Sequence, residues 1–321
     1  MSRAPQIPKI VVIGGGTGTF LVLNALKKHP VRLAAIVSMA DDGGSTGILR
    51  DQYGVLPPGD IRRALVALSQ ESTSLRKLFN YRFKNGDIGG HSFGNLFLSA
   101  LEKIEGSFER AVDEAARILN IAGEVIPVTL DNVRLNARLA DGVVIRGETN
   151  IDIPRERTRA PIAHVWLSPA GSLNPRAKAA ILSADMVVIG PGDLYTSIIP
   201  NILVSGMPDT LKKTRAKKVY VANLMTKHGE TDNFSGTRFV EEIEKYLGPR
   251  IIDYAIFNDK KPAHSVLLRY EKEGATFVDP KNADSALSGT ICIFTDLLAR
   301  GPFIRHDHKK LSAALLSISK K

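Results

Sequence analysis

The chain has almost no cysteine and no long apolar segment. Cys292 is the only cysteine among the 321 residues, which excludes an intrachain disulfide. It lies in the apolar run Ile291–Phe294, where we expect a buried, inert side chain. No apolar run approaches the ~20 residues that a transmembrane helix needs. Residues Met1–Pro5 also lack the apolar region of a signal peptide, so the sequence predicts a cytosolic protein.

Aromatic residues are scarce, although the chain is strongly basic. They make up 6% of the sequence, whereas the formal net charge is +10. The basic residues cluster at 155–159, at 212–218 and near the C-terminus. A nucleic-acid surface would combine such charges with stacking aromatics, and none of these clusters has that pattern. We therefore predict no nucleic-acid partner and interpret the charge as a solvated surface that attracts anionic ligands.

Internal repeats and low-complexity segments are absent, and 44% of the residues are hydrophobic. Apolar runs typical of buried strands alternate with stretches of helical periodicity. The strand candidates are Lys9–Ile13, Arg32–Met39, Met186–Ile189, Lys217–Ala222 and Ile251–Phe257. This alternation predicts an α/β fold with a mostly parallel sheet, and we expect residues 1–321 to form one domain.

Residues 124–168 differ from the rest of the chain. They contain four short β-like runs, at 124–127, 134–139, 143–146 and 163–168, with the turn dipeptide Asp141-Gly142 between two of them. We predict that 124–168 is an antiparallel hairpin region inserted into the α/β domain.

Three polar loops, each directly after a predicted strand, are the strongest functional signal. Because ligands of open α/β sheets bind at the carboxyl ends of the strands, we expect the three loops to line one cleft. Their clustered backbone N–H groups and short hydroxyls suit phosphate. The candidate phosphate-binding residues are Gly14, Gly15, Gly16, Thr17 and Gly18 in the first loop, Gly43, Gly44 and Ser45 in the second, and Gly190, Gly192, Asp193, Tyr195, Thr196 and Ser197 in the third.

The first loop resembles a dinucleotide-binding fingerprint only in part. Gly14 and Gly16 fit Gly-x-Gly-x-x-Gly, but Thr19 stands at the third glycine position. An NAD-type ligand therefore remains an alternative. A Walker-type loop is excluded because no Gly-Lys-Ser/Thr follows.

The second loop begins with two carboxylates, Asp41 and Asp42. Paired carboxylates beside phosphates commonly hold Mg²⁺, so both are candidate magnesium ligands, although one could instead accept hydrogen bonds from a ribose. We expect the two to differ, with one facing the phosphates and the other orienting the turn. Asp60, after two prolines, is either a helix cap or a ligand-facing residue.

The segment Gly89–Asn95 precedes a predicted buried helix over 94–104. Its His91 and Asn95 are flanked by glycines that would let a ligand approach, so both are candidate ligand-binding residues. No group of His, Cys and Asp residues has zinc-site spacing, and no Gly-x-Ser-x-Gly elbow is present.

Together these segments resemble the YvcK family, relatives of the CofD 2-phospho-L-lactate transferases. The resemblance runs from about Lys9 to the C-terminal helix, and Asp193 stands where the family often has Ser. The matching segments are 14–18, 40–45, 57–62, 90–96, 190–201 and 223–226.

The resemblance implies a CofD-like variant of the Rossmann-type three-layer sandwich. It also implies a cytosolic factor that binds UDP-sugars of the UDP-GlcNAc type and regulates central carbon metabolism and cell shape. The family's motifs add Asn201 and Asn223 to the candidate site, and its late Tyr and Arg map to Tyr270 and Arg305. The resemblance leaves a homodimer open.

Three functional hypotheses follow. The first is a regulatory, UDP-sugar-binding factor. The second is a Mg²⁺-dependent CofD-like phosphotransferase that uses a nucleotide-activated phospholactate donor. The third is an NAD-type dinucleotide-binding protein. Mg²⁺ is the one cofactor that the sequence suggests, and the residues do not identify the nucleobase.

Overall fold

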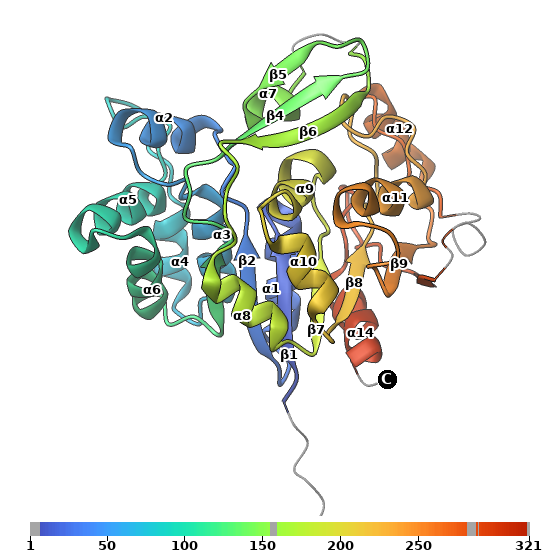
Figure 1. Cartoon of the computed structure of the whole chain (residues 1–321), viewed down its shortest axis with the longest axis horizontal. Coiled ribbons are helices and arrows are strands. Elements are labelled where there is room, and N and C mark those ends of the chain that lie inside the picture. Colours follow the sequence, from blue (N-terminus) through green and yellow to red (C-terminus); the bar gives the residue numbers. More distant parts are fainter. Residues whose placement is uncertain (1–6, 155–158, 281–286, 288, 320–321) are drawn as a thin grey trace, which may run out of the picture.

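The computed structural model describes residues 7–154, 159–280, 287 and 289–319. Its centre is a seven-stranded sheet in which every neighbouring pair is parallel (Figure 1). The strands are β1 (Lys9–Gly14), β2 (Arg32–Val37), β3 (Glu124–Pro127), β7 (Met186–Ile189), β8 (Lys217–Val221), β9 (Tyr254–Asn258) and β10 (Ile291–Thr295). The predicted α/β class with a parallel sheet is confirmed.

The strand order is β10-β9-β8-β7-β1-β2-β3. The chain starts in the middle of the sheet, runs outward through β2 to β3, returns to β7 beside β1, and continues to β10 at the other edge. The order therefore reverses between β1 and β7. In sheets of this kind the crevice at the reversal point, outside the carboxyl ends of the strands, is where ligands bind.

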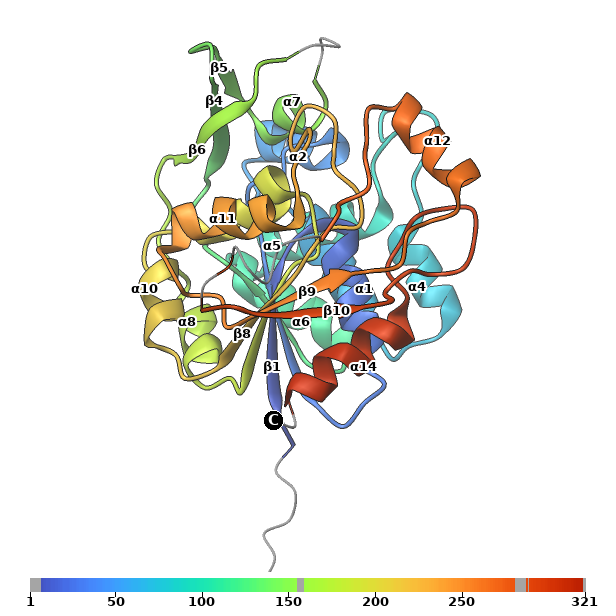
Figure 2. The same cartoon turned by 90° about the vertical axis from the view of Figure 1, so that its right-hand side faces the viewer.

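Helices cover both faces of the sheet (Figure 2). On one face α1 (Gly16–Leu26) packs against α3 (Gly59–Leu68) and α14 (His308–Ser319), and α3 packs against α6 (Phe108–Ile118). The other face carries α8 (Pro175–Leu182), α10 (Met207–Lys213) and α11 (Gly236–Leu247). The three-layer sandwich buries the central strands on both sides, which is why β7 is an unbroken apolar run.

The remaining helices lie above or beside these layers. They are α2 (Gly44–Tyr53), α4 (Thr73–Asn80), α5 (Phe93–Glu105), α7 (Glu148–Asp152), the π-turn η1 (Leu194–Ile198), α9 (Ile199–Ile202) and α12 (His264–Lys272). The expectation that 94–104 is buried all round is wrong. Ile104 is 75% exposed, and only one stripe of α5, including Asn95 and Leu98, faces inward.

The small antiparallel sheet sits on top of the sandwich (Figure 1). It contains β4 (Arg134–Leu139), β5 (Val144–Arg146) and β6 (Ile162–Ser168) in the order β5-β4-β6. The predicted hairpin at Asp141-Gly142 joins β4 to β5. The first predicted strand of this region is placed differently, because residues 124–127 pair in parallel with β2 as the edge strand of the main sheet.

Three further expectations concern Cys292, the chain ends with the basic clusters, and membrane-spanning helices. Cys292 is half-buried in β10 rather than fully buried. Residues 1–6, 155–158 and 320–321, which hold the N-terminal segment and part of the basic clusters, lie outside the described residues. Among the described residues, no helix has the length and apolar character needed to cross a bilayer.

Candidate ligand-binding site

A cavity of about 430 Å³ lies at the carboxyl ends of β1, β2 and β7, and residues of all three polar loops line it. The expectation that these loops share one cleft is therefore confirmed. Each loop also leads into a helical turn, since α1 begins at Gly16, α2 at Gly44 and η1 at Leu194. The first backbone N–H groups of a helix have no partner within that helix, and they carry a partial positive charge. Three such ends at one cavity favour an anionic ligand.

Glycine is needed in the first loop for two different reasons. Gly16 has φ of +64°, a conformation that side chains disfavour. Gly18 has ordinary angles, but a Cβ atom there would lie 2.0 Å from the carbonyl oxygen of Pro191. Gly18 thus lets the first turn of α1 pack directly on the loop after β7, which brings two of the three loops together.

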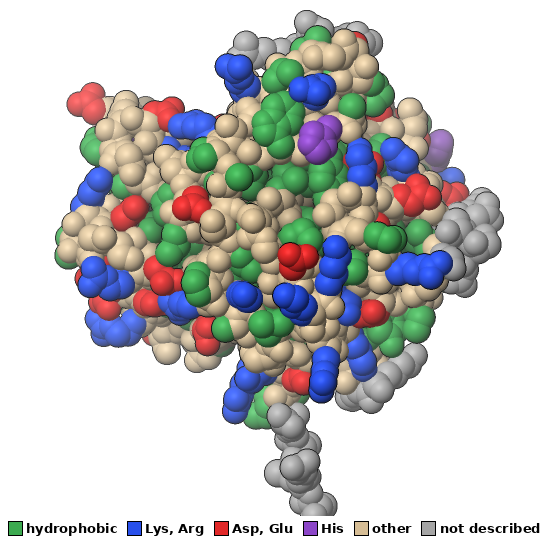
Figure 3. All heavy atoms as spheres, viewed as in Figure 1, with side chains coloured by type: hydrophobic (Ala, Val, Ile, Leu, Met, Phe, Trp, Pro, Cys, Tyr) green, Lys and Arg blue, Asp and Glu red, His purple; other side chains and the backbone are tan. Residues whose placement is uncertain are grey.

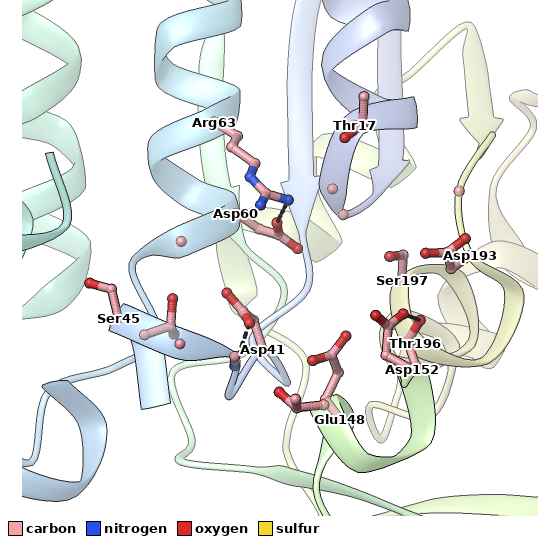
Figure 4. Close-up of a pocket in the computed structure, with 18 of the residues that line it drawn as sticks. Thr17, Asp41, Ser45, Asp60, Arg63, Glu148, Asp152, Asp193, Thr196 and Ser197 are labelled. Atoms are coloured by element: carbon pink, nitrogen blue, oxygen red, sulfur yellow. Dashed lines mark hydrogen bonds and ion pairs between the residues drawn. The ribbon is translucent and has the colours of Figure 1, made fainter. Parts of the chain in front are cut away.

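Two hydroxyl side chains face the cavity beside these turns. Thr17 is exposed at the start of α1, and Ser197 projects from η1 (Figure 4). Thr196 lies deeper, where its hydroxyl contacts Asp152 Oδ1 at 3.3 Å. Thr17 and Ser197 are therefore the hydroxyls of these loops best placed for a ligand oxygen.

Three guanidinium groups supply positive charge to the same cavity, from Arg62, Arg63 and Arg82. Arg62 is buried, and burial together with the charges of the other two arginines lowers its pKa to about 10. Arg63 is 48% exposed and pairs with Asp60 at 3.4 Å. Arg63 and Arg82 can reach an anion in the cavity, whereas Arg62 is held by its protein partners.

Those partners form a hydrogen-bonded chain that includes His91 and Asn95. Arg62 Nε donates to Asn95 Oδ1 at 2.9 Å, and Asn95 Nδ2 donates to Ser45 Oγ at 3.3 Å. Ser45 Oγ in turn lies 2.9 Å from His91 Nδ1. His91 is buried and does not line the cavity, whereas Asn95 and Ser45 do. His91 thus holds the Ser45 side chain in place at the start of α2.

The cavity also has an acidic wall, which we define as Asp41, Asp60, Glu148 and Asp152, with Asp60 directly beside Arg63. Burial, then the charge of Asp41, raises the pKa of Asp60 to about 6. Burial and the neighbouring carboxylates, Asp41 first among them, raise the pKa of Glu148 to about 9. At neutral pH Glu148 therefore carries a proton.

Asp41 and Asp42 do different jobs. Asp41 Oδ1 accepts a hydrogen bond from Gly43 N at 2.9 Å, and its side chain faces the cavity (Figure 4). Asp42 turns away and holds α7, because its carboxylate accepts from Glu148 N at 3.1 Å and from Thr149 N and Oγ1, both at 2.9 Å. Three protein donors occupy Asp42, which leaves Asp41 as the member of the pair that a ligand or a cation could reach.

A second acidic group lies behind the third loop. Asp152, Asp193 and Glu230 each place an oxygen within 4.8 Å of the others, and this is the one group with metal-ligand spacing in the described part of the chain. Lys227 Nζ lies among them, 2.8 Å from Asp193 and 3.0 Å from Glu230, and it also pairs with Asp152. Burial lowers the pKa of Lys227, but the three carboxylates outweigh it and raise the pKa overall. The ammonium group thus occupies the position that a cation would take.

Several predicted site residues do not line the cavity. Tyr195 is buried and donates its hydroxyl toward Glu242, while Asn201 is fully buried with its amide on Ser197 O at 2.8 Å. Tyr270 Oη accepts from Ile304 N at 3.0 Å, and Arg305 is exposed. Gly14, Gly190 and Asn223 also lie outside the lining.

The predictions from sequence missed part of the lining, above all Arg63, Arg82 and the residues of α7. Arg63 and Arg82 resembled ordinary surface residues, and α7 with Glu148 lies in an insertion without a recognised motif. One signal was available, since Arg63 follows Asp60 at i+3 on a helix and must share its face. Nothing in the sequence placed Glu148 opposite Asp41.

Comparison with known proteins identifies the family. The family described as 2-phospho-L-lactate transferase CofD matches residues 10–298. A protein of Thermotoga maritima is 43% identical over 97% of this chain and 99% of its own. The "Gluconeogenesis factor" of Halalkalibacterium halodurans is 39% identical over 96% of this chain and 95% of its own.

A solved structure agrees with the fold throughout. The crystal structure of a UPF0052 family member from Bacillus halodurans superposes with a TM-score of 0.92 at 37% identity, and it covers 98% of this chain and 100% of that one. The family match, the relatives and this structure all span nearly the whole chain. The chain therefore belongs to the CofD family, in its YvcK (UPF0052) branch of gluconeogenesis factors.

Proposed function

We propose that the protein is a regulatory factor that binds a nucleotide sugar of the UDP-GlcNAc type in this cavity. In this proposal ligand occupancy controls central carbon metabolism and cell shape through partners outside the chain. The gluconeogenesis-factor names of the relatives and the CofD-like fold support the metabolic part.

One observation carries the binding proposal. The starts of α1, α2 and η1 meet in a single cavity at the point where the strand order reverses. Backbone N–H groups at helix starts bind phosphate without regard to sequence, and Arg63 and Arg82 add donors of fixed geometry. A diphosphate placed here would lie against Thr17 and Ser197 and close to both guanidinium groups.

The transferase hypothesis is the second candidate, and the family match favours it. Mg²⁺ is the group that this hypothesis implies, and bound to phosphate oxygens it would neutralise their charge. Of the predicted metal ligands, Asp41 fits because it faces the cavity, whereas Asp42 does not because three protein donors occupy it. Asp41 would hold the ion, Asp60 would stand beside it, and Thr17 and Ser197 would orient the phosphates.

Two further assignments remain, the NAD-type ligand and the residues at the uridine end. An NAD-type ligand would use Asp41, which follows β2 where a ribose-binding acid is expected. For the uridine end we propose that Tyr270 and Arg305 contribute. Tyr270 supports the segment before Arg305 through its bond to Ile304, and Arg305 lies over the Phe303 ring at 5.2 Å.

Calorimetric titration with UDP, UDP-GlcNAc, GDP, NAD and ATP, each with and without Mg²⁺, tests the proposal. We expect UDP-GlcNAc to bind most tightly and without an absolute need for the metal. A preference for GDP with Mg²⁺ would favour the transferase hypothesis, and a preference for NAD would favour the dinucleotide hypothesis. Arg305→Ala should weaken UDP-GlcNAc binding and its dependence on salt together, and unchanged affinity would remove Arg305 from the site.

A further inference from the structure

The small antiparallel sheet has one covered face and one open face. Inward side chains of β4 and β6, such as Leu135 and Val165, are buried and belong to the main hydrophobic core. The register pairs Arg138 with Val144 on one side and with His164 on the other, so these side chains share the outward face. All three are exposed. The inserted region therefore presents an open sheet face.

This open face is basic. No Asp or Glu stands at an outward position of β4, β5 or β6. Of its three arginines, Arg134 pairs with Asp51, but no carboxylate among the described residues pairs with Arg138 or Arg146. Burial, then the charges of the neighbouring Lys and Arg side chains, lower the pKa of His164, so its ring is neutral at pH 7. The charge of this face is thus left for an outside partner to neutralise.

Aromatic rings and cations meet along β6. The His164 ring lies 6.1 Å from the Trp166 ring and 5.8 Å from the Tyr246 ring, with interplanar angles of 10° and 16°. Arg138 Cζ lies 5.8 Å from the centre of the Trp166 ring, and Lys245 Nζ lies 5.5 Å from that of Tyr246. Figure 3 shows blue, purple and green side chains grouped on the small sheet at the top of the view. We define the basic-aromatic face as Arg138, Arg146, His164, Trp166, Lys245 and Tyr246.

The end of α11 fastens this surface to the sheet. Tyr246 Oη accepts a hydrogen bond from Val165 N at 3.1 Å, and Lys245 Nζ donates to Ala163 O at 2.7 Å. These bonds occupy backbone groups at the edge strand β6, which an added strand would need for pairing. Recognition would therefore depend on side chains. Because they are held in place beforehand, binding would cost less conformational entropy.

We propose that the basic-aromatic face docks an acidic segment of a partner protein. Carboxylates of the segment would pair with Arg138 and Arg146, and an apolar side chain would lie against Trp166. Trp, Tyr and Arg contribute most to the energy of protein interfaces, and a positive patch attracts an acidic partner. This interaction goes beyond the proposed function, because it does not depend on what the cavity binds.

The same surface suits a nucleic acid less well. A base would stack on the free face of an aromatic ring, but Arg138 and Lys245 already lie over the rings of Trp166 and Tyr246. A base would have to displace these cations, whereas a carboxylate can pair with them where they are. The geometry therefore favours a polypeptide, which agrees with the expectation from the sequence that there is no nucleic-acid partner.

Trp166 is the only tryptophan, so its fluorescence reports directly on this surface. The full chain, without nucleotide, is titrated with three probes. They are a synthetic peptide in which Glu alternates with Leu and Phe, its counterpart with Gln in place of Glu, and an oligothymidylate of the same length. We expect a saturable change in fluorescence with the acidic peptide, weaker at higher salt, and little change with the other two.

Two variants test the contributing residues by calorimetry. Trp166→Ala should weaken binding of the acidic peptide about thirtyfold, as expected for an interface anchor. Arg138→Gln should weaken it about fivefold, because a contact between opposite charges is lost. Arg110→Gln, at an exposed position on α6, is the matched control and should bind as wild type does. Arg138 is exposed, so its variant still tests the surface if Trp166→Ala fails to fold.

Three results would overturn the proposal. The first is that the acidic peptide does not bind to the wild type. The second is that the oligothymidylate binds more tightly than the peptide, which would make the surface a nucleic-acid site. The third is that Arg138→Gln weakens the peptide no more than Arg110→Gln does, which would show attraction to the net charge of the chain rather than docking on this face.

Discussion

The two halves of the cavity are built in different ways. The main-sheet half combines backbone N–H groups and close-packed glycines at the ends of parallel strands with the side chains of Asp41, Asp60 and Arg63. The inserted half consists of carboxyl side chains on α7, a five-residue helix held by side-chain contacts from the loops below it. A backbone site is fixed by the fold and serves any phosphate, whereas a side-chain site can change residue by residue. In the proposed function, the main-sheet half would therefore bind the phosphates and the inserted half would face the rest of the ligand.

Gly18→Val should have the largest effect, because its side chain would disrupt the packing of the main-sheet half. Its side chain would enter the space now occupied by the Pro191 carbonyl oxygen, 2.0 Å from the Cβ position, and the loops after β1 and β7 would have to separate. We expect loss of binding for every nucleotide and a lower melting temperature. Thr17→Val, on the exposed neighbouring position, should keep the melting temperature. Wild-type binding by Gly18→Val would show that close contact of the two loops is not required.

Arg63→Gln should be the next largest change and should also affect all nucleotides alike. Removing a charge-assisted contact to phosphate predicts a loss of about tenfold for UDP and for UDP-GlcNAc. The remaining affinity should depend less on salt, as titrations at two ionic strengths would reveal. Arg63 also pairs with Asp60, so Arg63→Lys distinguishes a general charge effect from the forked geometry of the guanidinium. A loss confined to UDP-GlcNAc would show that Arg63 contacts the sugar. The assignment of the main-sheet half to the phosphates would then be wrong.

The same division explains what could be predicted from the sequence. The strand β7 was predicted with its observed bounds because a strand buried on both faces is an unbroken apolar run. The loops that follow the strands could be predicted as ligand-facing because glycine and hydroxyl residues directly after such runs are typical of phosphate-binding loops. The strand at 124–127 begins with the exposed Glu124 and is less apolar than β7. Nothing local states whether its partner is parallel or antiparallel, so its sheet was predicted wrongly.

The inserted half could not be predicted for a physical reason. Glu148 becomes a site residue only because Asp42, 106 positions earlier, holds the start of α7 beside the second loop. Such long-range side-chain contacts leave no periodicity and no motif in the sequence. The prediction that Asp41 and Asp42 differ was drawn from loop geometry, and Asp41 does face the cavity. The prediction did not say which of the two would orient the turn. Asp41 also accepts from Gly43 N in that turn, whereas Asp42 holds α7 in the inserted region.

Ser197→Ala should cause a smaller loss in the main-sheet half. The hydroxyl faces the cavity from η1, and none of the described residues hydrogen-bonds its oxygen. A single neutral hydrogen bond to phosphate predicts a loss of about fivefold for UDP and UDP-GlcNAc alike. The melting temperature without ligand should not change, and differential scanning calorimetry can verify this. If only UDP-GlcNAc is weakened, the distal ring rather than the phosphates lies against η1.

Glu148→Gln should change stability without ligand rather than nucleotide binding, and it isolates the inserted half. Burial, then the charge of Asp41, raises the pKa of Glu148 from 4.5 to about 9 in the folded protein. Between these two values the folded chain retains a proton that the unfolded chain releases, so this group makes the protein less stable as the pH rises through that range. Glutamine has no proton to lose at this position. The melting temperatures of wild type and Glu148→Gln should therefore agree near pH 4.5, and the variant should become the more stable of the two as the pH approaches 9. Glu271→Gln, at an exposed position on α12, is the matched control and should follow the wild type throughout. A constant difference between Glu148→Gln and wild type at all pH values would show that Glu148 is solvated like an ordinary surface residue, and the acidic wall would then have no special hold on a ligand.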